Sequence, residues 1–120
     1  MEANVDDLAT RYHKDIYIVE TGYPWVLDER TRSMGHVIGD KGGLLAGFPA
    51  TPDGQEQYLE KLIDVIRRIP DGRGKGLLYW APTWISPGKA ATTYDNVALF
   101  DYDGEALASF DTLGGNRPKR

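Results

Sequence analysis

The sequence contains no cysteine, and three further absences narrow the kind of protein it can encode. Without cysteine there is neither a disulfide framework nor a thiolate zinc site. No apolar run approaches the roughly 20 residues that a membrane-spanning helix needs. The formal net charge of −4 argues against nucleic-acid binding, and the acidic start MEANVDD lacks the pattern of a signal peptide. We therefore expect one modest globular domain with neither a nucleic acid nor a membrane as partner.

Motifs for phosphate and metal binding are incomplete. In GDKGG and GRGKG the lysine is not followed by the serine or threonine that a phosphate-binding loop requires. His13 and His36 are far apart with no adjacent ligand set, and DYDG at 101–104 lacks the third ligand and the later glutamate of a calcium loop. The sequence predicts no metal ion and no cofactor.

Hydrophobic periodicity predicts a first helix that leads directly into a strand. The helical face consists of Val5, Leu8, Ala9 and Tyr12. Asn4 is the predicted N-cap of this helix. A short apolar strand over 16–19 follows, and then a loop from 22 to about 50 that is unusually long for a strand-to-helix connection.

A second helix is predicted from Thr51, as N-cap, to Ile69. Pro52 suits its first helical position, and Pro70 with Gly72 ends it. Its apolar stripe consists of Tyr58, Leu59, Leu62, Ile63, Ile66 and Ile69. A second apolar strand over 76–80, a polar and aromatic loop, and a short helix over 105–110 complete the chain.

This alternation of helices and strands predicts a parallel α/β fold. Both strands are unbroken apolar runs, which is typical of strands covered on both faces. Ligands bind at the carboxyl ends of such strands, where Glu20 and Trp80 stand.

Three blocks of the chain resemble glycoside hydrolase family 53, the arabinogalactan endo-β-1,4-galactanases. These blocks are YIVETGYPW, FPATPDGQEQYLEKLIDVIRRIPDGRGKGLLYWAPTWI and YDNVALFDYDGEALASF. The resemblance implies an α/β fold that is the C-terminal portion of a TIM (β/α)8 barrel, with strands seven and eight and their helices. Residues 1–120 would then be part of a glycoside hydrolase catalytic domain.

The resemblance also implies a retaining mechanism that hydrolyses galactan in the arabinogalactan type I side chains of pectin, outside the cell. Glu20 would be the nucleophile, and a second carboxyl about 5 Å away would be the acid/base. The remaining glutamates of the chain do not stand in the Asn-Glu setting that holds the acid/base in this clan. The substrate-binding residues would be Tyr23, Trp25, Trp80, Trp84, Asp95 and Asn96.

Two strands cannot close a barrel, so we expect the isolated chain to be inactive and to self-associate through its unclosed edges. Several alternatives remain open at this point. Glu20 could pair with an arginine for structure, and Trp80 and Trp84 could be core residues. The chain could belong to a related glycosidase acting on mannan, xylan or glucan, or complete its barrel with another chain. It could also be a non-catalytic carbohydrate-binding remnant, a reading favoured by Ala81, which stands where the family usually has glutamate.

Overall fold

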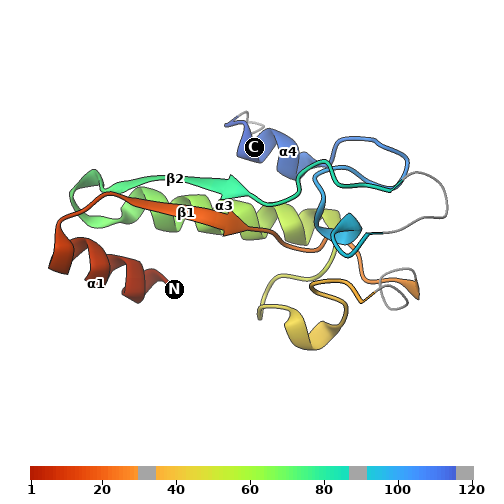
Figure 1. Ribbon diagram of the computed structural model, residues 1–120, viewed down its shortest axis with the longest axis horizontal. Coiled ribbons are helices and arrows are strands. Elements are labelled where there is room, and N and C mark those ends of the chain that lie inside the picture. The colour runs from red at the N-terminus through yellow and green to blue at the C-terminus, as the bar shows by residue number, and fades with distance from the viewer. Residues whose placement is uncertain (30–34, 87–91, 116–120) are drawn as a thin grey trace. The chain divides into compact units, whose positions relative to one another are not determined.

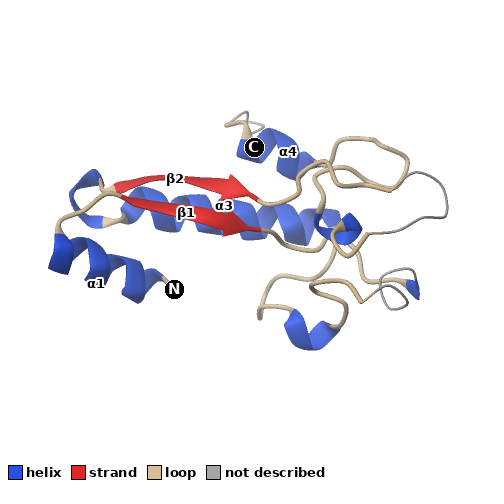
Figure 2. Cartoon of the chain, viewed as in Figure 1, coloured by secondary structure: helices blue, strands red, loops and turns tan. Residues whose placement is uncertain are grey.

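The computed structural model describes residues 1–29, 35–86 and 92–115 (Figures 1 and 2). Its helices and strands are α1 (Glu2–Tyr12), β1 (Ile16–Thr21), α3 (Pro52–Arg68), β2 (Gly74–Tyr79) and α4 (Ala108–Leu113). Short 3-10 turns lie at Lys41–Gly43, Pro70–Gly72 and Asp95–Val97. In the described ranges no helix has both the length and the apolar character needed to cross a membrane.

The chain divides into two compact units. Residues 1–21 and 60–80 form the first, which we call the strand unit because it contains β1 and β2. Residues 22–59 and 81–120 form the second, which we call the loop unit.

The strand unit is built on a parallel pair. β1 and β2 pair in parallel with Ile18 opposite Leu77 and Thr21 opposite Tyr79, and the register is irregular between these two pairs. Parallel neighbours need a long crossover connection, and α3 lies in that connection. The predicted βαβ alternation is therefore confirmed, with β1 two residues longer and β2 beginning two residues earlier than expected.

The core of the strand unit lies between helical and strand residues. Val5 and Ala9 of α1 pack with Val65 of α3 and with Ile69, and the partly buried Ile16 and Ile18 of β1 pack against this cluster. Full burial of a valine or isoleucine side chain stabilises the folded state by about 1.5–3 kcal/mol. Of the stripes predicted from the sequence, Val5, Ala9 and Ile69 lie in this core, whereas Leu8 and Tyr12 are exposed. Val65, which the predicted stripe did not include, takes part in the core.

A close approach of backbone to backbone fixes the start of β2 against α3. A Cβ atom on Gly74 would lie 1.9 Å from the carbonyl oxygen of Ile66, so a larger residue cannot occupy this place without movement of the main chain. Gly74 is therefore required by packing rather than by its backbone dihedral angles.

The predicted start of α3 is confirmed and its end, Arg68, is one residue earlier than predicted, whereas the cap of α1 is different. The Thr51 hydroxyl accepts a hydrogen bond from the N–H of Gly54 at 3.0 Å, and α3 begins at Pro52. The prediction of Asn4 as the cap of α1 was wrong, because Met1 is the N-cap and its carbonyl accepts the N–H of Asn4. Asn4 lies within the first turn.

The last helix begins three residues later than expected. Asp101 Oδ1 accepts the N–H groups of Asp103 and Glu105, both at 2.9 Å, and Ala106 forms an isolated bridge with Phe100. These bonds hold 101–106 as a turn, so α4 starts at Ala108. Competition from a local side-chain bond explains the shift.

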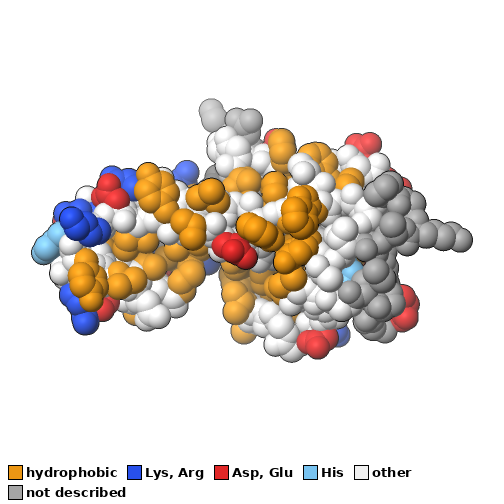
Figure 3. Space-filling view, in the orientation of Figure 1, with side chains coloured by type: hydrophobic (Ala, Val, Ile, Leu, Met, Phe, Trp, Pro, Cys, Tyr) orange, Lys and Arg blue, Asp and Glu red, His pale blue; other side chains and the backbone are white. Residues whose placement is uncertain are grey.

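One face of the strands is uncovered in the described residues, although their unbroken apolar runs are typical of strands covered on both faces. Val19 is 70% exposed and Leu78 is 55% exposed, and Tyr17 and Trp80 are also exposed. Figure 3 shows hydrophobic side chains over the two strands. The helices cover only one face of the two strands. The apolar residues on the other face indicate a second covering layer, which the described residues do not provide.

Candidate functional site

The predicted site residues fall in both compact units, so each group is described by itself. In the strand unit, Glu20 is the penultimate residue of β1 and its side chain is exposed. Among the residues that the structure describes, none makes a hydrogen bond or an ion pair with Glu20. Every arginine whose ion pair is seen in that part of the chain, including Arg73, binds another carboxylate. This geometry gives no support to a structural pair between Glu20 and an arginine.

Trp80 stands beside the end of β1. Its backbone N–H donates to the carbonyl of Thr21 at 2.7 Å, which ties the residue after β2 to the residue after Glu20. The Trp80 side chain is 42% exposed, so it is not a core residue of this unit. The strand unit therefore presents a carboxylate and an indole from the carboxyl ends of two paired parallel strands, the end at which α/β folds bind ligands.

In the loop unit, Tyr23 is buried, with 2% of its surface exposed. Its hydroxyl donates to the carbonyl of Phe48 at 2.7 Å and accepts the N–H of Leu45 at 3.0 Å. Its ring stacks on Tyr58 with centroids 4.5 Å apart. Both ends of the side chain are thus used in holding the long loop, which does not fit direct contact of Tyr23 with a ligand.

The two remaining tryptophans differ in exposure. Trp84 is 50% exposed and packs edge-to-face on Tyr94, with centroids 5.4 Å apart. Trp25 is partly buried, packs against Tyr102, and donates from Nε1 to the carbonyl of Asp95 at 3.3 Å. Trp84 is therefore half exposed and held against Tyr94, an arrangement that suits stacking on a flat apolar partner.

Asp95 and Asn96 are both fully buried in the 3-10 turn Asp95–Val97. Asp95 Oδ1 accepts three hydrogen bonds, from the N–H and hydroxyl of Ser86, each at 3.1 Å, and from the hydroxyl of Thr92 at 2.9 Å. Asn96 Nδ2 donates to the carbonyls of Ile38 at 2.8 Å and Val26 at 3.3 Å. These hydrogen bonds are all to the protein itself, whereas Asn96 Oδ1 is buried and has no hydrogen-bond partner among the described residues.

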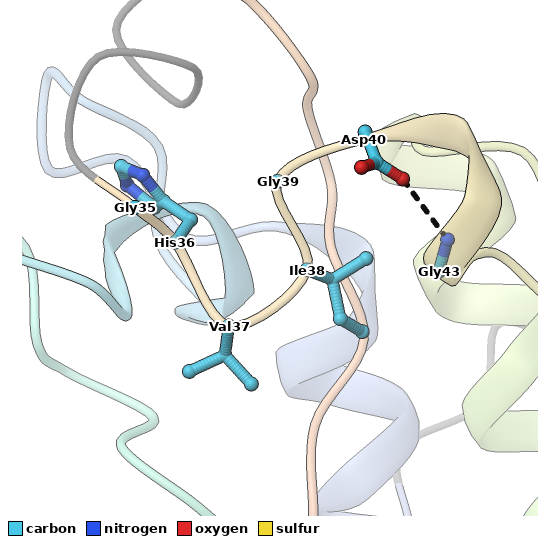
Figure 4. A pocket seen from close by; sticks show the side chains of 7 residues that line it. All are labelled: Gly35, His36, Val37, Ile38, Gly39, Asp40 and Gly43. Atoms are coloured by element: carbon cyan, nitrogen blue, oxygen red, sulfur yellow. Dashed lines mark hydrogen bonds between the residues drawn. The ribbon is translucent and has the colours of Figure 1, made fainter.

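An open pocket of about 520 Å³ lies in the loop unit around residues 35–40 and Gly43 (Figure 4). Asp40 caps the adjoining turn, with Oδ1 accepting the N–H of Gly42 at 2.7 Å and of Gly43 at 3.3 Å. No group of three or more histidine, aspartate or glutamate side chains that could hold one metal ion occurs in the described ranges. A capped turn therefore borders the pocket, and the described residues provide no set of metal ligands there.

Gln55 is a buried residue of the loop unit that the sequence analysis did not identify. Its Nε2 donates to the carbonyls of Tyr23 at 2.8 Å and Ala98 at 3.0 Å, and its Oε1 accepts the hydroxyl of Ser109. It therefore links α3, the loop after β1 and α4. One signal was available, since Gln55 lies three and four residues before Tyr58 and Leu59 and so interrupts an apolar stripe with a polar residue.

Comparison with known proteins gives relatives of the whole chain. A protein of Niallia circulans, described as an uncharacterized protein in the bgaB 5′ region, is 40% identical over an alignment of 118 residues that covers 92% of this chain and 31% of that protein. An arabinogalactan endo-β-1,4-galactanase of Cellvibrio japonicus is 36% identical over 103 residues, or 81% of this chain and 26% of the relative. The chain thus spans about a third or less of the length of these relatives.

Solved structures agree on the fold. The Ignisphaera aggregans GH53 catalytic domain matches with a TM-score of 0.81 at 29% identity, covering 98% of this chain and 34% of that domain. A structure of fungal β-1,4-galactanases matches with a TM-score of 0.67 at 22% identity, which shows the fold alone. The α/β fold is therefore that of one part of a TIM barrel, as predicted. The family model for glycosyl hydrolase family 53 matches residues 1–113, and the chain belongs to this family.

Proposed function

We propose that this chain carries the nucleophile and part of the sugar-binding surface of a retaining endo-β-1,4-galactanase. The observation that carries the proposal is the position of Glu20. Its carboxylate is exposed, has no partner among the described residues and lies at the carboxyl end of β1, which a backbone hydrogen bond joins to Trp80. Family membership and relatives named as arabinogalactan endo-β-1,4-galactanases support galactan as the substrate.

The chemistry proceeds in two displacements. The Glu20 carboxylate attacks the anomeric carbon of a galactosyl unit as the glycosidic bond breaks, and a second carboxyl protonates the leaving oxygen. That second group then deprotonates a water molecule, which displaces Glu20 and releases the sugar with its original anomeric configuration. A strand end holds the nucleophile within the small tolerance that such an in-line displacement needs.

We propose that the exposed rings of Trp80 and Trp84 stack on the apolar faces of galactose units. A large rigid ring covers sugar CH groups at little cost in conformational entropy. Pectin side chains are polymers that stay outside cells, so we place the reaction there.

The acid/base is the group that the 120-residue chain does not supply in this proposal. Without it the leaving group lacks general-acid assistance, worth about 10²–10⁴-fold in rate. The isolated chain is accordingly expected to be inactive and to self-associate through the exposed side chains of β1 and β2, whose outer edges have no strand partner within the described residues.

The test is a complete family 53 catalytic domain that contains this segment, assayed on β-1,4-galactan with mannan, xylan and β-glucan alongside. NMR of the first product should show the β-anomer of the new reducing end. Preferred hydrolysis of another polymer would overturn galactan as the substrate, and first release of the α-anomer would overturn the retaining mechanism. Binding without turnover would favour a carbohydrate-binding protein instead.

A further inference from the structure

Asp95 and Asn96 form a buried junction between two loops of the loop unit. Both side chains have no exposed surface. A ligand could touch them only after the turn Asp95–Val97 had opened. Their burial therefore indicates a role other than direct contact with a ligand.

The first half of this junction holds the loop after β2. A single oxygen, Asp95 Oδ1, accepts three hydrogen bonds from Ser86 and Thr92, which stand on either side of 87–91 in the sequence. A buried donor that loses its acceptor has no water to replace it, so each of these bonds matters for the closed loop. Asp95 thus ties Ser86 to Thr92 and fixes the position of the neighbouring Tyr94, on which Trp84 packs.

The second half holds the loop after β1, through backbone carbonyls as well as the Asn96 amide. The carbonyl of Asn96 accepts the N–H of Trp25 at 2.8 Å, and the carbonyl of Asp95 accepts the Trp25 indole N–H at 3.3 Å. The Asn96 side chain binds Val26 and Ile38. Trp25 is therefore anchored at its backbone and at its ring by the same two residues.

We infer that Asp95 and Asn96 are positioning residues that hold Trp84 and Trp25 in the geometry in which they meet the sugar chain. Only the identity of the ligand rests on the proposed function. The positioning itself rests on the hydrogen bonds within the loop unit and can be measured without any ligand.

Hydrogen exchange on the full 120-residue chain measures the positioning. The reporters are the N–H groups of Trp25, bound to Asn96, and of Val37, bound to the carbonyl of Thr93 at 3.1 Å. In Asp95→Leu their exchange should accelerate about 10- to 100-fold relative to Val65 in α3, because the buried donors of Ser86 and Thr92 lose their acceptor. Asp95→Asn keeps an acceptor oxygen and should recover at least half of the effect on a logarithmic scale.

The matched control is Ser109→Ala, which removes a buried hydroxyl elsewhere in the same unit and should leave both reporters unchanged relative to Val65. If Asp95→Leu does not fold, the double variant Ser86→Ala with Thr92→Val removes the two donor hydroxyls and should give the same pattern. Equal acceleration at Val65, no acceleration, or an Asp95→Asn variant that behaves like leucine would each overturn the inference.

A second arm tests the ligand. In a complete family 53 domain containing this segment, Asp95→Leu and Trp84→Ala should each weaken galactotetraose binding, and the double variant should lose less than the sum, because both changes act on the same ring. Additive losses would overturn the claim that Asp95 acts through Trp84. Faster exchange at Trp25 and Val37 with unchanged galactotetraose affinity would confirm that Asp95 and Asn96 hold the loops. The same result would exclude galactan as the substrate in the proposed function.

Discussion

The backbone N–H of Trp80 donates to the carbonyl of Thr21 at 2.7 Å, and Thr21 is the last residue of β1 and directly follows Glu20. This bond continues the parallel pairing past the last residue of β2, Tyr79, which lies opposite Thr21. A hydrogen bond of this length between main-chain groups fixes two neighbouring residues to each other far better than contacts between loop side chains would. The proposed nucleophile and the proposed stacking residue are thereby anchored to one rigid pair of strand ends.

In a complete family 53 domain containing this segment, Glu20→Gln should lower turnover by about 10⁴-fold or more, a loss typical of removing one member of a catalytic set. The amide has nearly the same shape as the carboxylate but cannot form the glycosyl intermediate. A reducing-sugar assay and a circular dichroism spectrum measure activity and folding together. Asp15→Asn is the matched control, because it makes the same chemical change just before β1 and should affect only the ion pairs of Asp15 with Arg73 and Lys75. A folded Glu20→Gln enzyme with substantial activity would exclude Glu20 as nucleophile.

Trp80→Ala in the same domain should weaken binding of galactooligosaccharides about 10-fold, since aromatic stacking contributes roughly 0.5–1.5 kcal/mol beyond area burial. Calorimetric titration at a temperature where the variant stays folded gives the affinity. Tyr12→Ala, which truncates another exposed aromatic at the opposite end of the strand unit, serves as the control. Unchanged affinity in Trp80→Ala would assign the indole to packing.

Charges on the exposed face of the strands should keep the isolated chain monomeric. The double variant Val19→Lys with Leu78→Lys places lysine at two positions that are 70% and 55% exposed, and lysine on an open sheet discourages pairing with another sheet. Size-exclusion chromatography should show association for the unmodified chain and a shift toward monomer for the variant. Leu45→Lys, at an equally exposed leucine in the loop unit, should produce no such shift. A monodisperse unmodified monomer would contradict the proposal of self-association.

Gly74→Ala should lower the free energy of unfolding by about 1–3 kcal/mol, the usual cost of forcing an extra group into a packed place. The added Cβ would meet the carbonyl oxygen of Ile66 at 1.9 Å, so α3 and β2 would have to separate. Gly114→Ala is the control, because the nearest atoms to its Cβ are at 3.6 Å. Urea unfolding of both variants compares them, and equal midpoints would show that this contact is readily relaxed.

Gln55→Glu should destabilise the chain by about 1–3 kcal/mol. The change replaces the donating Nε2 with an oxygen that faces the carbonyls of Tyr23 and Ala98, leaving these buried acceptors without their hydrogen bonds. The exposed neighbour Gln57 provides the control variant Gln57→Glu. Thermal unfolding should separate the two, and equal stability would mean that the Gln55 bonds contribute nothing net.

Local signals in the sequence were sufficient for the elements and for the ends of α3. Thr51, Pro52 and Pro70 act on backbone groups within a few residues, so their effects can be read without knowledge of the fold. The apolar runs located both strands, and with them Glu20 and Trp80 at strand ends, because strand length and period depend on neighbouring residues alone.

Tertiary structure decided which of the predicted site residues are exposed. Tyr23, Asp95 and Asn96 look like site residues in the sequence, yet their hydrogen-bond partners bury them, and these partners include residues as far away as Phe48 and Val26. Gln55 likewise acquires its role from Ser109, 54 positions later. A buried polar side chain must find hydrogen-bond partners wherever the fold brings them, and no local pattern records pairs so distant in the chain. The sequence therefore determined the elements and the strand-end residues, while the three-dimensional packing separated the residues that support the loops from those left exposed to a ligand.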